Sequence, residues 1–158
     1  MELVFYGLAV LAIVIVDQWT KLLVLNNIPL YGHVDAIPGL FHFTYVQNTG
    51  AAFSSFEGMR WMFVAVFLVL TLALVYERFK KPMPFNKFER WCIVSVYAGG
   101  LGNVIDRVRL GYVVDMIKLD FMKFAVFSVA DCFITCGAIA MLISLVFFNK
   151  KFWKEEKT

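Results

Sequence analysis

The chain has 158 residues, of which 61% are hydrophobic and 17% are charged, and its formal net charge is +3. Soluble domains have about 45–50% apolar and about 25% charged residues, so the composition excludes an ordinary soluble domain, a disordered chain and a coiled coil. The net charge is too small to indicate nucleic-acid binding. Three cysteines and two histidines are too few for a disulfide framework or a metal site.

Four apolar segments are long enough to cross a bilayer, because a spanning helix needs about 20 mostly apolar residues. They cover approximately residues 3–25, 59–76, 91–108 and 129–148. Lipid offers no partners to backbone polar groups, so each segment is expected to be a helix. The sequence therefore predicts an integral membrane protein, mainly α, in which residues 1–158 form a single domain built on a four-transmembrane-helix bundle.

Lysine and arginine residues flank these segments unevenly. One group lies between the second and third segments and another follows the fourth: Arg78, Lys80, Lys81, Lys87, Arg90, Lys150, Lys151, Lys154 and Lys157. Cytoplasmic flanks carry the excess of basic residues, so both termini are expected in the cytoplasm. Residues 26–58 and 110–128 then form two outer connections, although Arg60, Lys118 and Lys123 reduce the asymmetry.

The first outer connection contains a pattern typical of a β-strand. Residues 41–46 alternate with period two and carry aromatic side chains on one face. The turn signal Pro38-Gly39 precedes this strand, and residues 34–37 are its expected partner. We therefore expect a small extracytoplasmic β-sheet within about residues 30–57, between the first two helices. The second connection suits either an interfacial strand or a short helix.

Ionisable residues in or beside membrane spans are costly to bury and are therefore candidates for function. In the topology above, the following lie near the outer face: Asp17, Lys21, Asp106, Arg107, Asp115 and Asp131. Asp115 and Asp131 have apolar neighbours. Two such carboxylates brought together can share a proton and activate a water molecule. Catalysis is favoured for Asp115, whereas catalysis and helix capping stay equally open for Asp131.

The other polar candidates each have two interpretations. Asp17 and Lys21 are one helical turn apart, which favours an orienting ion pair at the membrane surface over a catalytic role. Arg107 shares a helix face with Asn103 and either holds a carbonyl or lipid headgroup or locks the outer loops. Asn48 either completes a local turn or directs its amide at an extended peptide.

Motifs of several other enzyme classes are missing from the sequence. It contains no H-E-x-x-H, no G-x-S-x-G and no Walker loop, which leaves acid–base chemistry by aspartates or no chemistry. Three alternatives stay open: a small transporter or channel subunit, a metal-dependent lipid headgroup transferase and a structural assembly factor.

Five motifs occur in the order and approximate spacing of the lipoprotein signal peptidase (signal peptidase II) family. They are Asp17-Gln-Trp-Thr-Lys21, Gln47-Asn48-Thr-Gly50-Ala51-Ala52-Phe53, Gly102-Asn103-Val-Ile-Asp106-Arg107, Gly111-Tyr-Val-Val-Asp115 and Val129-Ala130-Asp131. The chain resembles this family over nearly its whole length. The resemblance implies an aspartic endopeptidase of the bacterial cytoplasmic (inner) membrane. Such an enzyme removes the signal peptide of a prolipoprotein by cutting before a cysteine that carries a diacylglyceryl group.

The resemblance also implies roles for individual residues. Asp115 and Asp131 would be the catalytic pair. The residues that would bind substrate or support the site are Asn48, Gly50, Asn103, Arg107, Asp17, Lys21 and Ser128. Ser128 stands where the family commonly has Asn. No metal or organic cofactor is implied, the expected partners are a lipidated prolipoprotein and membrane lipid, and the chain is expected to be a monomer.

Overall fold

The structure is a computed structural model that describes residues 1–50, 58–80, 82–149 and 151–155. The end of the expected outer β region, residues 51–57, lies outside the described residues. The same holds for the Ala51-Ala52-Phe53 part of the second motif.

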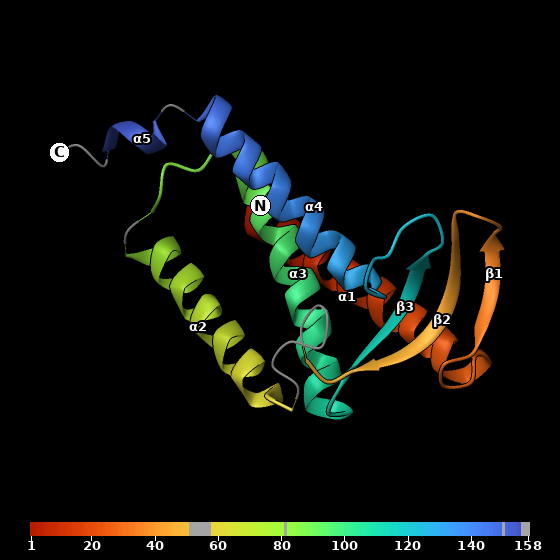
Figure 1. The fold of residues 1–158 in the computed structure, drawn as a ribbon. Helices are drawn as coiled ribbons and strands as arrows, with labels where there is room; N and C mark the ends of the chain where they lie inside the picture. Colours follow the sequence, from red (N-terminus) through yellow and green to blue (C-terminus); the bar gives the residue numbers. More distant parts are fainter. Residues whose placement is uncertain (51–57, 81, 150, 156–158) are drawn as a thin grey trace.

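Four long helices form the body of the molecule (Figure 1). They are α1 (Glu2–Asn27), α2 (Arg60–Phe79), α3 (Lys87–Arg109) and α4 (Val129–Ile143). A π-helical segment, η2 (Ser144–Phe148), extends α4, and a short helix, α5 (Phe152–Glu155), follows it. The mainly helical fold with four long helices is confirmed, and each predicted segment coincides with one of them.

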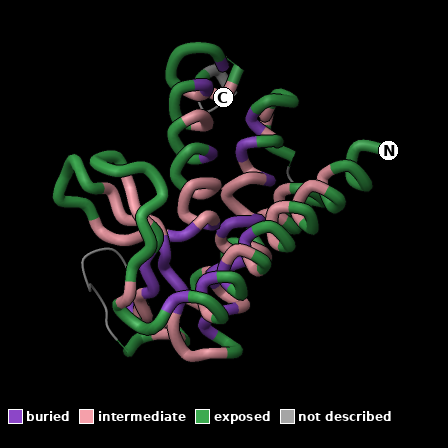
Figure 2. Tube along the Cα trace, turned by 90° about the vertical axis from the view of Figure 1, so that its right-hand side faces the viewer, coloured by how far each residue is buried: buried purple, intermediate pink, exposed green. Residues whose placement is uncertain are grey.

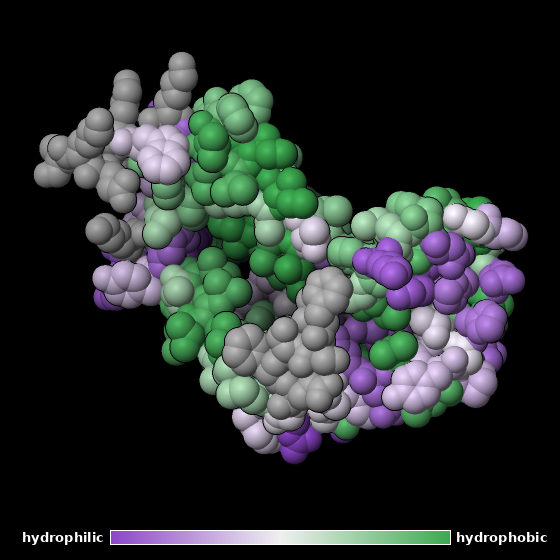
Figure 3. Space-filling model, viewed as in Figure 1, coloured by the Kyte–Doolittle hydropathy of each residue, from purple (hydrophilic) through white to green (hydrophobic). Residues whose placement is uncertain are grey.

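The third helix differs from the other three. Among the described residues, α1, α2 and α4 with its η2 extension are long and apolar enough to cross a membrane, and α3 is not among these candidates. The four predicted segments are thus four long helices, and α3 is less apolar than the other three. This helix packs against α1, α2 and α4, and its polar side chains Asn103, Asp106 and Arg107 are buried within the protein. Figure 2 shows the buried residues gathered at the centre of the molecule, and Figure 3 shows hydrophobic side chains over the helices.

Contacts between the ends of helices show how the helices are aligned. Lys87 Nζ at the start of α3 lies 3.4 Å from Glu2 Oε1 at the start of α1. Asn149, just after η2, donates from Nδ2 to Glu89 Oε2 at 2.7 Å. Asn86 and Glu89 form a capping box that begins α3. The start of α1, the start of α3 and the end of η2 therefore lie at one end of the bundle.

A three-stranded antiparallel sheet lies at the other end. It has the order β1-β2-β3, with β1 at His33–Ile37, β2 at Phe41–Asn48 and β3 at Val113–Leu119. The predicted hairpin is confirmed, and its turn residue Gly39 has a positive φ of 75°. The second outer connection forms a strand, not a helix, so the sheet is not confined to the segment between the first two helices.

An apolar cluster explains why the third strand joins this sheet. Val114 and Met116 of β3 are buried against Tyr45 of β2 and against Val24 and Ile28 from the end of α1. Burial of apolar area on this scale stabilises the attachment of the sheet to the helix bundle. The register places residue 115 of β3 opposite residue 46 of β2 and brings it near the end of β2.

Candidate active site

A cavity of about 620 Å³ lies between α2, α3, α4 and one edge of the sheet. Its walls are mostly apolar and include Phe63 and Phe67 of α2 and Ile134 of α4. Six of the polar residues singled out from the sequence line it: Asn48, Gly50, Asn103, Arg107, Asp115 and Asp131. Residues far apart in the chain thus meet in one polar patch within an apolar pocket.

Asp115 reaches the cavity from β3 and is almost fully buried. Its Oδ2 accepts a hydrogen bond of 2.8 Å from Asn48 Nδ2. Its Oδ1 is buried and, among the described residues, has no hydrogen-bond partner. Burial first, and then the nearby charge of Asp131, raise the pKa of Asp115 from its ordinary value of 3.8 to about 7. Asp115 can therefore hold a proton near neutral pH.

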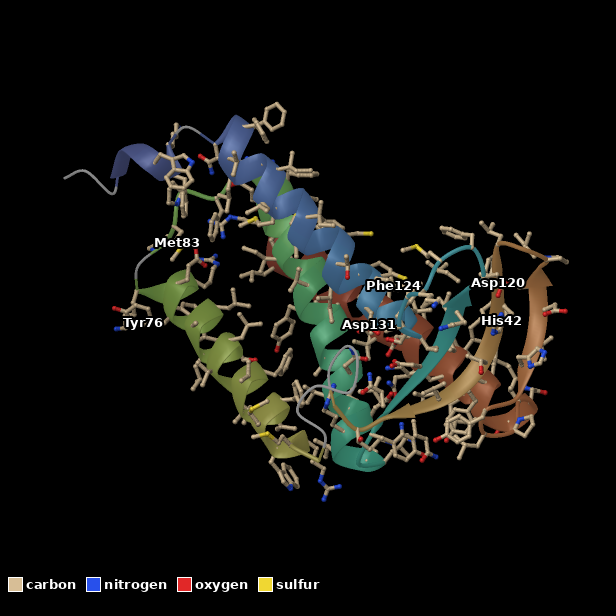
Figure 4. All side chains as sticks on the ribbon, viewed as in Figure 1. His42, Tyr76, Met83, Asp120, Phe124 and Asp131 are labelled. Atoms are coloured by element: carbon tan, nitrogen blue, oxygen red, sulfur yellow. The ribbon has the colours of Figure 1, made fainter. Side chains whose placement is uncertain are left out.

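Asp131 lies in the first turn of α4 (Figure 4) and lines the same cavity. Its Oδ2 accepts hydrogen bonds of 2.8 Å from both N and Oγ of Ser128, the N-cap residue. Its Oδ1 accepts a third, also 2.8 Å, from Asn103 Nδ2. The capping interpretation of Asp131 is therefore correct, but one carboxylate oxygen caps the helix while the other is held at the cavity wall. Ser128 supplies both side-chain and backbone contacts to this carboxylate.

A buried ionic network lies behind the cavity wall. Lys21 Nζ lies 2.9 Å from Asp17 Oδ2 and 2.9 Å from Asp106 Oδ2. It also donates to Asn103 Oδ1 at 3.1 Å. The predicted pairing of Asp17 with Lys21 forms, and both side chains are buried inside the protein, at 0% and 2% exposed.

The two carboxylates of this network also hold the main chain beside the cavity. Asp17 Oδ1 accepts a hydrogen bond of 2.9 Å from the backbone N–H of Ala130, next to Asp131. Asp106 Oδ2 accepts one of 3.1 Å from the backbone N–H of Val114, next to Asp115. The network therefore fixes the backbone on which each cavity aspartate is carried.

Sequence reasoning placed Asp106 near the outer face but gave it no role. Its second oxygen accepts a hydrogen bond of 2.8 Å from Gln18 Nε2, and Gln18 was not singled out at all. The only available signal was that both residues fall inside recognised motifs. The pairing between them requires that α1 and α3 cross at this level.

Arg107 connects α3 with the end of β2. It donates from Nη2 to the carbonyl oxygen of Gly50 at 2.7 Å and from Nη1 to that of Asn103 at 3.3 Å. Its guanidinium carbon lies 4.3 Å from the ring centroid of Phe63. The arrangement supports the interpretation that Arg107 locks an outer loop, and its position on the cavity wall leaves it accessible to a bound carbonyl.

Asn48 has both a local and a longer-range contact. Its Oδ1 accepts a hydrogen bond of 3.0 Å from the backbone N–H of Gly50, which is the local turn expected from sequence. Its amide nitrogen is directed at Asp115. Among the described residues, no group of three or more His, Cys, Asp or Glu side chains is placed to hold a metal ion.

Comparison with known proteins shows similarity to one family in sequence and in structure. A family described as "Signal peptidase (SPase) II" matches residues 9–147. The lipoprotein signal peptidase of Streptococcus thermophilus (strain CNRZ 1066) is 42% identical over 162 residues, which cover 99% of this chain and 97% of that protein. The lipoprotein signal peptidase of Streptococcus pyogenes serotype M2 (strain MGAS10270) is 38% identical over 151 residues, with 96% and 94% covered.

Two solved structures have the same fold. One, described as "Bacterial membrane enzyme structure by the in meso method at 2.3 A resolution", has a TM-score of 0.85 and 32% identity and covers 93% of this chain and 90% of its own. A second, described in the same words at 1.9 Å, has a TM-score of 0.81 and 32% identity, with 92% and 94% covered. Because the match extends over nearly the whole chain in sequence and in fold, this protein belongs to the signal peptidase II family.

Proposed function

We propose that this signal peptidase II removes the signal peptide of a prolipoprotein by acid–base catalysis with Asp115 and Asp131, and that it cuts before the lipidated cysteine. The observation that carries this proposal is the convergence of both carboxylates, from different elements, on one largely apolar cavity. The raised pKa of Asp115 supports it. An aspartate pair needs one acid and one base at the same pH.

The shape of the cavity supports entry of the substrate from the bilayer. A second, apolar cavity of about 310 Å³ lies between α2, α3 and α4 and shares Leu70 with the first. The two adjoin at Leu70, and the second lies farther from the aspartates along the bundle. The diacylglyceryl chains would lie along these two cavities, while the extended peptide places its scissile carbonyl between Asp115 and Asp131. Asn48 and Arg107 are placed to hold backbone groups of that peptide.

The topology proposed here places the sheet and the aspartates at the extracytoplasmic face of the bacterial cytoplasmic membrane. The alignment of α1, α3 and η2 supports it, because Lys87 at the start of α3 and Asn149 just after η2 lie at one end of the bundle, and the basic flanks of the sequence would place that end in the cytoplasm. The chain would act as a monomeric single domain with both termini in the cytoplasm. A reporter that is active only outside the cytoplasm, fused after Thr158, is expected to be inactive, and an active fusion would contradict this topology.

The central experiment is cleavage of a lipidated precursor by purified enzyme. Asp115→Asn and Asp131→Asn each remove a titratable group at nearly constant shape, so each is expected to lower kcat by at least about 1,000-fold, on the scale of losing a general acid or base. Asp120→Asn is the matched control. Asp120 pairs with His42 at 2.6 Å on the sheet and does not line the cavity (Figure 4).

The control is expected to retain near-normal turnover. Substantial cleavage by a folded Asp115→Asn or Asp131→Asn enzyme would refute the catalytic pair. A chelator separates the peptidase from a metal-dependent headgroup transferase, because an aspartate pair works without a metal ion. Loss of cleavage in chelator that is restored by added metal would contradict catalysis by the aspartate pair alone.

A further inference from the structure

The two cavity aspartates differ sharply in how they are hydrogen-bonded. Asp131 accepts three hydrogen bonds, two from Ser128 and one from Asn103. Asp115 accepts one, from Asn48, and its Oδ1 has no partner among the described residues. Hydrogen bonds donated to a carboxylate favour its charged form, whereas burial without donors favours the neutral acid. The asymmetry therefore assigns different charges to two residues of the same type.

We infer that in the resting enzyme Asp131 is the carboxylate and Asp115 is the carboxylic acid, and that Lys21 fixes this order through the side-chain amide of Asn103. The inference rests on the proposed function and assigns roles within the catalytic pair. Asp131 is then the base and Asp115 the acid in the first step. Lys21 and Asn103 are positioning residues, since each acts through Asp131.

The orientation of the Asn103 amide follows from donor and acceptor chemistry. The Lys21 ammonium group has three donors and no acceptor, so only the amide oxygen of Asn103 can face it at 3.1 Å. The amide nitrogen must then point the other way, where it donates to Asp131 Oδ1. Lys21 is held in this position by Asp17 and Asp106 on either side. A lysine on α1 thereby determines which group faces a carboxylate on α4.

The start of α4 stabilises the same charge on Asp131. Asp131 occupies the third position of the helix, and Ser128 is the N-cap. Negative charge is favoured in the first turn of a helix, because unpaired N–H groups point toward it. The Ser128 hydroxyl accepts from the Asp131 backbone N–H at 3.3 Å and donates to Asp131 Oδ2 at 2.8 Å. Serine therefore still supplies a donor at the position where the family commonly has asparagine.

Other charged or titratable groups lie on the helices packed around the pair. They are Lys21 and Asp17 on α1, Asp106 and Arg107 on α3, and Cys132 on α4. Lys21 and Arg107 lower the pKa of Asp115, but burial and the charge on Asp131 outweigh them and raise it to about 7. Asp115 can therefore stay neutral although Lys21 and Arg107 are nearby.

Both aspartates return to their starting protonation states after one turnover. Asp131 accepts a proton from water as the water oxygen attacks the scissile carbonyl carbon, and Asp115 donates its proton to the carbonyl oxygen, which gives a gem-diol. The C–N bond then breaks as Asp131 returns its proton to the leaving nitrogen. Asp115 takes a proton from one diol hydroxyl at the same time, so the acid product forms and both residues return to their starting states.

Carbon-13 NMR of full-length enzyme labelled at the aspartate carboxyl carbons tests the charge assignment directly. The Asp115→Asn and Asp131→Asn variants identify the two signals. In the wild-type enzyme, the Asp131 signal is expected to report a carboxylate while Asp115 still reports the acid, and Asp115 is expected to change from acid to carboxylate near pH 7. The reverse order, or simultaneous titration, would overturn the inference. It would leave the proposed function standing, since that fails only if the Asn variants still cleave.

The role of Lys21 is tested by the acid limb of the pH dependence of kcat/KM. Asn103→Leu removes the donor to Asp131 and is expected to move this limb upward by about 1–2 pH units, the worth of one hydrogen bond to a charged group. Lys21→Met frees the amide to turn and is expected to move it in the same direction. If both folded variants leave the limb where it is, the positioning role is wrong.

A matched control exists at the other end of the bundle. Asn149 donates from Nδ2 to the buried Glu89 carboxylate at 2.7 Å, which is the same type of bond. Asn149→Leu is expected to lower Tm and leave the acid limb unchanged. A similar pH shift in this control would mean that loosening of the bundle causes the effect, and this would also overturn the positioning role. The NMR titration of wild-type enzyme stays decisive for the charge assignment if Lys21→Met or Asn103→Leu does not fold.

Discussion

The α-carbon of Gly102 on α3 packs directly against the carboxylate of Asp17 on α1. A Cβ added at Gly102 would lie 2.5 Å from Asp17 Oδ2, well inside van der Waals contact. The same oxygen accepts the ion-pair contact from Lys21. The close approach of the two helices is therefore required for the ionic network behind the cavity.

Gly102→Ala is expected to damage both stability and turnover. The added methyl group must displace Asp17 or separate the helices, and overpacking of this kind costs about 1–3 kcal/mol. Asp17 also holds the backbone N–H of Ala130, so its displacement shifts the start of α4 and is expected to lower kcat by about 10–100-fold. Thermal unfolding and precursor cleavage measure the two effects.

Gly7→Ala provides the control for this change. Gly7 is in α1, and its Cβ would meet nothing within 4 Å. Alanine is favoured over glycine in a helix by about 1 kcal/mol, so this variant is expected to be at least as stable as wild type and equally active. Equal behaviour of Gly102→Ala and Gly7→Ala would contradict the requirement for close packing.

Arg107→Lys tests whether the guanidinium shape matters or only its charge. Lysine keeps the charge but cannot maintain both carbonyl contacts, to Gly50 and Asn103, together with the stacking on Phe63. We expect kcat/KM to fall about 10-fold, the equivalent of one hydrogen bond to a charged group, in a protein that still folds.

Arg109→Lys is the matched control for Arg107. Arg109 is exposed and donates to Gln18 Oε1 at 3.1 Å, outside the cavity lining. This variant is expected to have wild-type kinetics. Wild-type kinetics in Arg107→Lys as well would mean that Arg107 acts as a generic cation.

The raised pKa of Asp115 predicts a pH-dependent stability. Its folded-state pKa of about 7 lies above the ordinary value of 3.8, so folding is favoured by proton binding. The contribution is fully present below about pH 4 and is lost as the pH rises through about 7, with a size of at most roughly 4 kcal/mol. Asp115→Asn is expected to flatten the dependence of Tm on pH in this window, whereas an unchanged slope would show that Asp115 is ionised throughout.

Several features could be predicted because their signals are local. The apolar runs marked the helices, the alternation in residues 41–46 marked β2, and the isolation of Asp115 and Asp131 among apolar neighbours marked them as candidates. Each of these signals is contained in a window of a few residues to about 20 residues. The cost of exposing apolar side chains, or of burying charge, depends mainly on the residues within such a short segment.

Other features depend on contacts between distant segments. β3 joins the hairpin because Val114 and Met116 pack against the end of α1 and against Tyr45. No local sequence pattern predicts which strand β3 pairs with. The sequence likewise offered several carboxylates near Lys21, but only the crossing of α1 and α3 decides that Asp106 is its second partner. α3 can contain polar residues because α1, α2 and α4 pack against it. The hydropathy of α3 alone does not predict this packing.

Glu89, at the end of the bundle away from the sheet, is another residue whose environment the sequence does not indicate. It lies between basic residues in sequence and resembles an exposed flank, yet it is fully buried. Its carboxylate accepts hydrogen bonds of 2.8 Å from Asn86 N, 2.8 Å from Ser144 Oγ and 2.7 Å from Asn149 Nδ2. These contacts fasten the π-helical end of α4 to the first turn of α3.

Glu89→Gln is expected to destabilise the protein by about 1–3 kcal/mol, since the new NH₂ group must face a donor and leaves a buried group unsatisfied. Cleavage by the folded fraction is expected to be normal, because the aspartates lie at the other end of the bundle. Glu2→Gln, which removes only the exposed 3.4 Å contact with Lys87, should change stability by less than about 1 kcal/mol. A loss of kcat in folded Glu89→Gln would show instead that the two ends of the bundle are coupled.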